Sequence, residues 1–130
     1  MSTLLNSMSA SVSGMAAQST RLRLSSENIA NADTPGYRRK LVPFRQVLDD
    51  SGQSGAVRVG RVRLDRTEPE RLFDPANPMA DEDGYYESSN VNLMVEIADA
   101  REAQRSYEAN LRMFDQARQM TTSLLDLLRR

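Results

Sequence analysis

Two long stripes of mostly apolar residues, one at each end of the 130-residue chain, constrain its fold more than any other feature. In both stripes every step is three or four residues, which places the members on one face of a helix. The first stripe comprises Met1, Leu5, Met8, Val12, Met15, Ser19, Leu22, Ser26 and Ile29. The second comprises Leu93, Ile97, Ala100, Gln104, Tyr107, Leu111, Phe114, Arg118, Thr121, Leu125 and Leu128. Because two helices enclose one seam and not a full core, we expect the chain to need packing partners outside itself.

The composition excludes most catalytic and metal chemistry. The chain has no Cys and no His, so thiol nucleophiles, disulfides, the usual zinc ligands and the commonest general base are missing. The acidic run that ends at Gly84 fails as a calcium loop, because alignment to an EF-hand puts Met79 and Asn90 at positions that should be acidic. We therefore predict no enzyme activity, no metal and no cofactor.

The charge is balanced overall but unevenly placed. The net charge is −1, yet residues 38–71 carry nine basic and five acidic groups, whereas residues 72–130 carry six basic and eleven acidic groups. This balance, and the lack of aromatic residues among the basic ones, argue against nucleic-acid binding. Opposite charge on the two segments is either ordinary solvated surface or an attraction between neighbouring subunits.

Neither a secretory leader nor a membrane span is expected. The first residues have no basic region followed by an apolar one, as a cleavable signal peptide would. No window approaches the roughly 20 apolar residues that cross a bilayer.

Turn chemistry ends the first helix, which we expect over about residues 3–31. Pro35 disfavours helix at Thr34, and Pro35-Gly36 is the central pair of a type II turn in which Gly36 takes a positive φ. Gly14 lies in the middle of the helix, where we expect valine to be accepted with a small gain in helix propensity.

The middle segment is predicted to be a small β-rich insertion. In the stretch 57–64 the apolar residues alternate but slip by one position, so we predict a β-bulge at Gly60 and Arg61. Its partner strand is expected in one of two places, which are residues 37–47 and the pair Tyr85-Tyr86.

The predicted fold class is mainly α. The last helix is expected after Asn90, taken as its N-cap, and runs to about Leu128. Together the N- and C-terminal helices form an elongated coiled-coil-like hairpin with a small β-hairpin or irregular insertion. We divide the chain into 1–37, 38–90 and 91–130, and expect the first and last segments to pack as one helical domain.

Two stretches resemble signatures of the bacterial flagellar axial proteins, the rod and hook family. The first is Ser25-Ser26-Glu27-Asn28-Ile29-Ala30-Asn31-Ala32-Asp33-Thr34-Pro35-Gly36-Tyr37. The second is the tail Asn90-Val91-Asn92, followed by Glu96 and by Arg105-Ser106-Tyr107-Glu108-Ala109-Asn110. Hook and distal-rod proteins have much larger middles, and residues 74–92 are similar to the proximal-rod proteins of the FlgC type, with the shorter FlgB type as the alternative. Gln104 and Arg118 stand where the family pattern has plain apolar residues.

The resemblance implies a structural subunit of the proximal rod of the flagellar basal body. Its partners would be copies of itself, other flagellar rod proteins and the flagellar type III export apparatus, which delivers such subunits to the periplasm without a cleavable signal. They assemble into a helical tube that transmits motor torque. The residues alone leave open another interpretation, a soluble coiled-coil adaptor that binds a partner helix.

Particular residues are expected to carry the assembly. On the first helix the interface residues are Leu5, Met8, Val12, Met15, Leu22 and Ile29. On the last helix they are Ile97, Ala100, Tyr107, Leu111, Phe114, Leu125 and Leu128. The exit from the first helix is expected to be fixed by Asn28, Asn31, Pro35, Gly36 and Tyr37.

Overall fold

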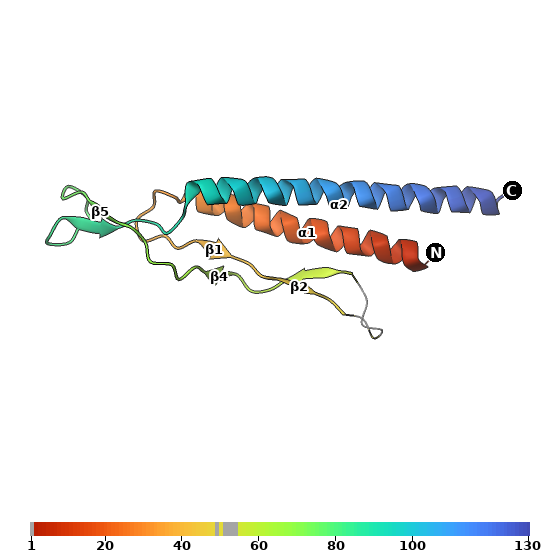
Figure 1. Cartoon of the computed structure of the whole chain (residues 1–130), viewed down its shortest axis with the longest axis horizontal. Coiled ribbons are helices and arrows are strands. Elements are labelled where there is room, and N and C mark those ends of the chain that lie inside the picture. The colour runs from red at the N-terminus through yellow and green to blue at the C-terminus, as the bar shows by residue number, and fades with distance from the viewer. Residues whose placement is uncertain (1, 49, 51–54) are drawn as a thin grey trace. The chain divides into compact units, whose positions relative to one another are not determined.

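Two long helices lie at the ends of the chain, with short antiparallel strands between them (Figure 1). The computed structural model describes residues 2–48, 50 and 55–130. Helix α1 covers Ser2–Ala30 and helix α2 covers Leu93–Leu128. The strands are β1 (Lys40–Leu41), β2 (Phe44–Gln46), β3 (Val57–Val59), β4 (Arg63–Leu64), β5 (Arg71–Phe73) and β6 (Tyr85–Glu87). The mainly α fold with a small antiparallel β insertion is therefore confirmed.

The start of α2 differs from the prediction by two residues. Asn92, and not Asn90, is the N-cap, because its Oδ1 accepts hydrogen bonds from the backbone N–H of Met94 at 3.1 Å and of Val95 at 3.3 Å. The predicted cap at Asn90 is wrong, since the side chain of that residue bonds to the backbone of residues 39, 65 and 67 instead. Both asparagines satisfy the sequence rule for a cap, and only the tertiary contacts separate them.

The exit from α1 is the predicted type II turn. The backbone N–H of Tyr37 donates to the carbonyl of Thr34 at 3.2 Å, which closes a four-residue turn around Pro35 and Gly36. Gly36 has a φ of 75°, the left-handed region that the second central residue of this turn requires. The Gly36 N–H also donates to the carbonyl of Glu87 at 3.2 Å, so the turn is bound to the end of β6.

The predicted bulge is visible in the strand register. β1 pairs with β4 and β2 pairs with β3, so the first of the two expected partner segments is confirmed. Two residues separate β1 from β2, whereas three residues, 60–62, separate β3 from β4. Gly60 is close to Pro43: its N–H donates to the Pro43 carbonyl at 2.9 Å, and an added Cβ would lie 2.8 Å from Pro43 Cγ. One extra residue on the second strand restores the alternation, as the sequence indicated.

Tyr85 and Tyr86, the other expected partner, belong to a separate hairpin. β6 pairs antiparallel with β5, placing Phe73 opposite Tyr85. The Phe73 and Tyr85 rings are 5.1 Å apart at 60°, an edge-to-face contact. Strand β5 was not predicted from the sequence, because three residues following a turn-rich stretch show no clear alternation.

By its contacts the chain divides into two compact units. Unit 1 comprises Met1–Thr20, Pro43–Gly60 and Glu102–Arg130, and unit 2 comprises Arg21–Val42 and Arg61–Arg101. Each helix thus contributes to both units. The division into 1–37, 38–90 and 91–130 was made along the sequence and not by contacts. It stays a prediction.

Small and polar residues fill the buried faces of the two helices. In unit 1 the buried helical residues include Ser11, Ala103 and Ala117. Each of the three directly precedes a member of a predicted stripe. In unit 1, α1 and α2 approach closely where Gly14 faces Asn110. At these positions the face that packs within the chain is therefore turned by one residue from the stripe of large apolar side chains.

We predict that Gly14→Ala brings no gain in stability, although the sequence alone leads us to expect a small gain for valine. A Cβ at this position would lie 2.8 Å from Oδ1 of Asn110, so the Asn110 amide must move away and give up its 2.9 Å hydrogen bond to the Ser106 carbonyl, which offsets the gain of about 1 kcal/mol in helix propensity. Urea unfolding followed by far-UV circular dichroism measures the difference. In an Asn110→Ala background the same substitution should stabilise the protein by about 1 kcal/mol, and a single variant clearly more stable than the wild type would show that the helices do not meet here.

We predict that Gly36→Val lowers stability far more than Gly36→Asn. The turn leaves open space around a Cβ, with nothing within 4 Å, so the backbone angle alone causes the penalty. Asparagine tolerates the left-handed region, whereas a β-branched residue is strongly disfavoured there. Thermal melting of the two variants compares them directly, and equal melting temperatures would contradict this account of the turn.

Candidate functional site: a polar junction and an exposed apolar surface

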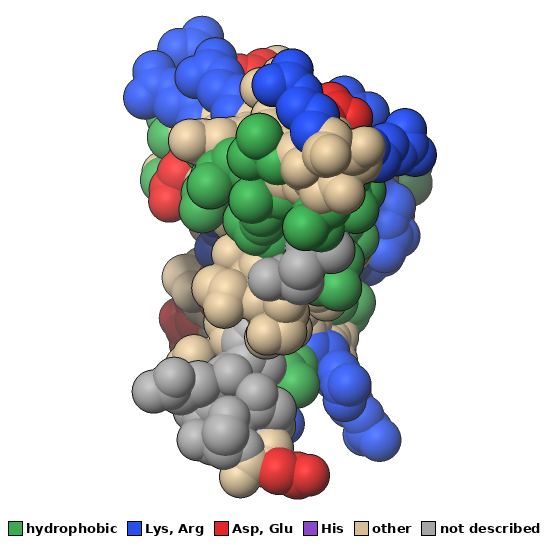
Figure 2. Space-filling model, turned by 90° about the vertical axis from the view of Figure 1, so that its right-hand side faces the viewer, with side chains coloured by type: hydrophobic (Ala, Val, Ile, Leu, Met, Phe, Trp, Pro, Cys, Tyr) green, Lys and Arg blue, Asp and Glu red, His purple; other side chains and the backbone are tan. Residues whose placement is uncertain are grey.

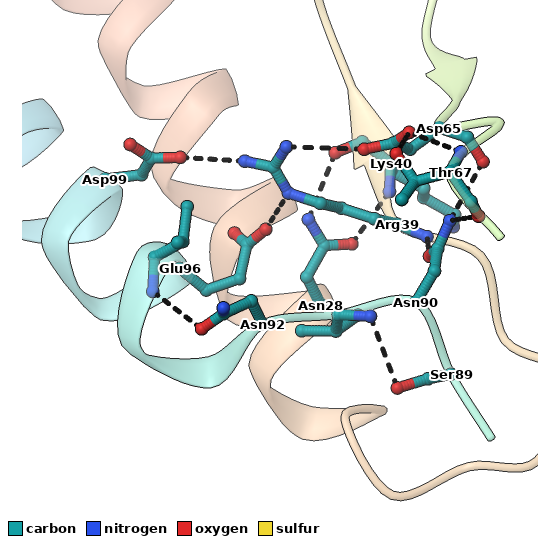
Figure 3. A network of polar contacts seen from close by, with 12 residues as sticks. Asn28, Arg39, Lys40, Asp65, Thr67, Ser89, Asn90, Asn92, Glu96 and Asp99 are labelled. Atoms are coloured by element: carbon teal, nitrogen blue, oxygen red, sulfur yellow. Dashed lines mark hydrogen bonds and ion pairs between the residues drawn. The ribbon is translucent and has the colours of Figure 1, made fainter. Parts of the chain in front are cut away.

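Arg39 is the centre of a polar junction in unit 2 (Figure 3). It lies between the exit turn and β1, and its guanidinium faces three carboxylates. Nε forms a hydrogen-bonded ion pair with Glu96, Nη2 lies 2.7 Å from Oδ2 of Asp99, and Nη1 lies 3.6 Å from Oδ2 of Asp65. The charge of this one side chain therefore joins the first turns of α2 to the segment after β4.

Because Glu96 is buried, the folded state requires its ion pair with Arg39. The Glu96 side chain is 1 % exposed, and a buried carboxylate without a cation is very unfavourable. Burial acts to lower the pKa of Arg39, but the hydrogen bond and charge of Glu96, with the charges of Asp99 and Asp65, raise it above the ordinary value. Asp99 also lies 3.5 Å from the guanidinium of Arg21 on α1. Both helices thus contribute to one charge network.

Asn28 connects α1 to the exit turn and to β1. Its side chain is almost fully buried and makes three hydrogen bonds. Oδ1 accepts from the Lys40 N–H and from the Tyr37 hydroxyl, both at 2.9 Å, and Nδ2 donates to the Lys40 carbonyl at 3.0 Å. Burial raises the pKa of Tyr37, with a further rise from Glu27 and Glu96 and an opposing effect of Lys40. The Asn28 amide therefore bonds both backbone groups of Lys40, as a neighbouring strand would.

Asn90 and Ser89 complete the junction from the other side. Oδ1 of Asn90 accepts from the Arg39 N–H at 2.6 Å, and its Nδ2 donates to the carbonyls of Asp65 and Thr67, each at 3.0 Å. The Ser89 hydroxyl donates to the carbonyl of Ala32. Four segments that are distant in sequence are held together: the end of α1, the start of β1, residues 65–67 and the approach to α2.

The Asp65 carboxylate is held by two hydrogen bonds from Thr67. Oδ1 accepts from the Thr67 N–H at 2.9 Å and from the Thr67 hydroxyl at 2.7 Å. These two hydrogen bonds, followed by the charge of Arg39, lower the pKa of the Asp65 carboxyl below its usual value. Asp65 is thus held ionised in the position that Arg39 requires.

The five predicted turn residues lie in or beside this junction. Asn28 and Tyr37 bond to each other, and Pro35 and Gly36 form the turn. Asn31 acts locally: its Nδ2 donates to the Glu27 carbonyl at 2.9 Å, and its Oδ1 accepts from Thr34 at 3.2 Å. All five are therefore close to the exit from α1.

The charged members of the junction were not predicted from the sequence. In the sequence Arg39 is one of nine basic residues in 38–71, and Glu96 stands out only as part of a family signature. The signal that could have found the pair is a lone acidic residue within the apolar run Leu93-Met94-Val95-Glu96-Ile97, which requires a cation close in space once it is buried.

None of the predicted interface residues on the two apolar stripes is fully buried, and about half of them are exposed. On α1, Leu5 and Val12 are about half exposed, whereas Met8, Met15, Leu22 and Ile29 are partly buried. On α2, Ile97, Ala100 and Phe114 are partly buried, and the exposed members are Tyr107, Leu111, Leu125 and Leu128, the last at 78 %. In unit 1, Figure 2 shows hydrophobic side chains gathered on the face seen from the chain ends, with basic side chains beside them.

The exposed apolar side chains of the two helices offer packing surfaces. Among the described residues no group of three or more His, Cys, Asp or Glu side chains is placed to hold a metal ion. The same residues include no helix long and apolar enough to cross a membrane. The carboxylates of the junction face a guanidinium that they neutralise, which is a structural use of charge.

Comparison with known proteins gives one consistent family. A family model described as Flagella basal body rod protein matches residues 8–38, and another described as Flagellar basal body rod FlgEFG protein C-terminal matches residues 82–127. A flagellar basal-body rod protein FlgC from Agrobacterium fabrum is 48 % identical over 124 residues, covering 90 % of this chain and 89 % of the relative. FlgC proteins from Yersinia enterocolitica and Salmonella typhimurium are 36 % and 35 % identical over 131 residues, each covering 95 % of this chain and 97 % of the relative.

We predict that Arg39→Met is strongly destabilising and that adding Glu96→Leu recovers most of the loss. The single variant leaves a buried carboxylate without its cation, which costs about 3–5 kcal/mol, whereas the double variant replaces the pair by apolar contacts. Denaturant unfolding of the wild type and both variants measures this. A double variant no more stable than Arg39→Met would show that the Glu96 charge is not what Arg39 compensates.

We predict that Thr67→Val weakens the protein at neutral pH but not in strong acid. The variant removes the hydroxyl donor to Asp65, so the pKa of that carboxyl should rise, as followed by NMR titration. A carboxyl with a lowered folded pKa stabilises above its unfolded pKa of about 3.9 and loses this effect as the pH falls through the folded value. We expect a difference of about 1 kcal/mol at pH 7 that disappears near pH 2. A difference that persists in acid would point to packing instead.

Proposed function

Since this chain belongs to the FlgC family of flagellar basal-body rod proteins, we propose that it assembles with other rod proteins into a helical tube that transmits motor torque. It is a structural subunit of the proximal rod. The FlgB-type alternative has less support, because the relatives at 48 %, 36 % and 35 % identity are named FlgC. The role requires many parallel contacts and no catalysis.

The observation that carries this proposal is the free apolar surface of the two helices. The buried apolar residues of the described chain are Ala17, Leu24, Ala103 and Ala117, three of them alanines. Much larger side chains, such as Leu111 and Leu125, remain exposed on α2. Burying apolar area gains roughly 25 cal/mol per Å², so contact with other subunits that covers these side chains adds stability beyond that of the chain's own seam.

The interface is proposed to follow the two stripes. On α1 it comprises Leu5, Met8, Val12, Met15, Leu22 and Ile29, and on α2 Ile97, Ala100, Tyr107, Leu111, Phe114, Leu125 and Leu128. In this proposal segments 1–37 and 91–130 act as one helical domain, a coiled-coil-like hairpin, while 38–90 is an insertion. The close approach of Gly14 and Asn110 supports the pairing of the helices.

Side-by-side helices suit the transmission of torque. Twisting a tube of this kind must shear every helical seam together, so stiffness comes from the number of contacts. A helical tube also repeats one head-to-tail contact, which requires two different surfaces on each subunit. Delivery by the flagellar type III export apparatus and a periplasmic position in the basal body complete the proposal, as the resemblance to the rod and hook family implies.

We predict that deleting residues 124–130 leaves export intact but abolishes rod assembly. Leu124, Leu125, Leu127 and Leu128 are all exposed in the single chain, so their loss should hardly affect its folding. If these leucines are buried between subunits, removing each side chain costs about 2–5 kcal/mol of assembly free energy. Secretion of the chain, swimming motility and its presence in purified basal bodies are the measurements.

A control deletion of Arg129 and Arg130 alone keeps the leucines and should swim normally. Normal swimming of the longer deletion would show that the C-terminal tip is not an interface. A soluble adaptor would instead form discrete two- or four-helix oligomers and be absent from basal bodies, and that result would overturn the proposed function itself.

A further inference from the structure

Two arginines face each other on the outer side of the β2–β3 pair. Arg45 and Arg58 are direct cross-strand partners, so their side chains lie on the same face of the pair. Their neighbours Phe44 and Val57 point to the opposite face, where both line a cavity of about 300 Å³ with residues of α1. The Val57 N–H also donates to Oγ of Ser13 at 3.0 Å. The face that carries the arginines is therefore turned away from α1.

This arginine pair has no carboxylate of its own. Both residues are exposed, and neither forms an ion pair or hydrogen bond through its side chain within the described part of the chain. Like charges directly opposite each other destabilise an antiparallel pair. The single chain thus carries an unfavourable contact that an anionic group placed between the two guanidinium groups would make favourable.

A matching pair of carboxylates lies at the tip of the β5–β6 hairpin. Glu82 and Asp83 are exposed, and their carboxylates have no partner among the described residues. The adjacent Asp81 is occupied, since it lies 2.6 Å from Arg71 and accepts the backbone N–H groups of Asp83 and Tyr85. These bonds fix the shape of the tip, so the two free carboxylates are presented by a rigid loop.

We propose that the Arg45–Arg58 pair of one copy binds the Glu82–Asp83 tip of a second copy of this chain. The inference rests on the proposed assembly and specifies one of its contacts. The two unpartnered cations equal the two unpartnered anions in number and are opposite to them in sign. The arginines lie in the segment of net positive charge, 38–71, and the carboxylates in the segment of net negative charge, 72–130. Because the two surfaces differ, the contact is head-to-tail and repeats from copy to copy, as a helical tube requires.

Acidic residues of α2 fit this role less well. Asp115 lies 3.6 Å from Arg118, and Glu108 is one turn from Arg112 on the same helix face. A guanidinium pair approaching α2 would meet these arginines as well as the acids. At the hairpin tip Arg71 is already bound to Asp81.

Cysteine cross-linking tests the contact directly, because the chain has no cysteine. Purified Arg58→Cys is mixed with purified Asp83→Cys and oxidised, so that a mixed disulfide dimer joins only different molecules. Glu68→Cys and Glu108→Cys, mixed with the same Arg58→Cys chain, are matched comparators at other exposed acidic positions. We expect a mixed-dimer yield at least about fivefold above both comparators, falling as salt screens the contact.

Charge reversal supplies the second test. A chain with Arg45→Glu and Arg58→Glu should associate about tenfold more weakly with the wild type. A chain with Glu82→Arg and Asp83→Arg should show the same weakening. Mixing the two reversed chains should restore the contact. Equal cross-linking at all three acidic positions, no cross-link at all, or no restoration would overturn the inference. The presence of the tagged wild-type chain in basal bodies reports separately on the proposed function.

Discussion

The buried carboxylate of Glu96 is the constraint on which the path of the chain through unit 2 depends. It lies in the first turn of α2, is 1 % exposed, and must be met by a cation. Arg39 supplies that cation from the residues that follow the exit turn. The turn at Pro35 and Gly36 sets the direction in which the chain leaves α1, and Asn28 binds the backbone of Lys40 next to Arg39.

A second constraint is the size of the residues between the helices. Serine, glycine and alanine allow α1 and α2 to approach closely in unit 1, but they bury little apolar area. Several larger apolar side chains, such as Leu5, Val12 and Leu111, stay exposed one position along the helix from these small residues or farther. In the proposed assembly, binding of a partner to the folded form shifts the folding equilibrium and adds to the stability of the chain. There the same feature that leaves the single subunit with little buried apolar area provides the surface for assembly.

Much of the fold could be predicted from the sequence because its signals are local. Steps of three and four residues predicted both helices, Pro35-Gly36 predicted the type II turn, and a slip in alternation predicted the bulge at Gly60. Which helical face packs inside the chain could not be predicted this way. Ser11 and Asn110 are polar and Ala103 is only weakly apolar, so the stripes of larger apolar residues are the pattern that the sequence shows.

Only some residues of the polar junction could be predicted from the sequence. Asn28 and Tyr37 were identified through the turn and the resemblance, whereas Arg39 was hidden among Arg38 and Lys40. An ion pair between residues 57 positions apart leaves no periodic pattern, and only the fold brings Arg39 and Glu96 together. The misplaced cap at Asn90 has the same origin, because two asparagines two residues apart differ only in their tertiary contacts.

The central claim is that the exposed apolar face of α2 becomes buried in the rod. Leu125→Cys offers the most direct test, because it introduces the only thiol in the chain on that face. Its labelling by a water-soluble maleimide is compared in the free chain and in purified basal bodies, with Glu68→Cys as a surface reference. We expect rapid labelling of both thiols in the free chain and protection of residue 125 alone after assembly. Equal labelling of residue 125 in the two states would contradict the claim.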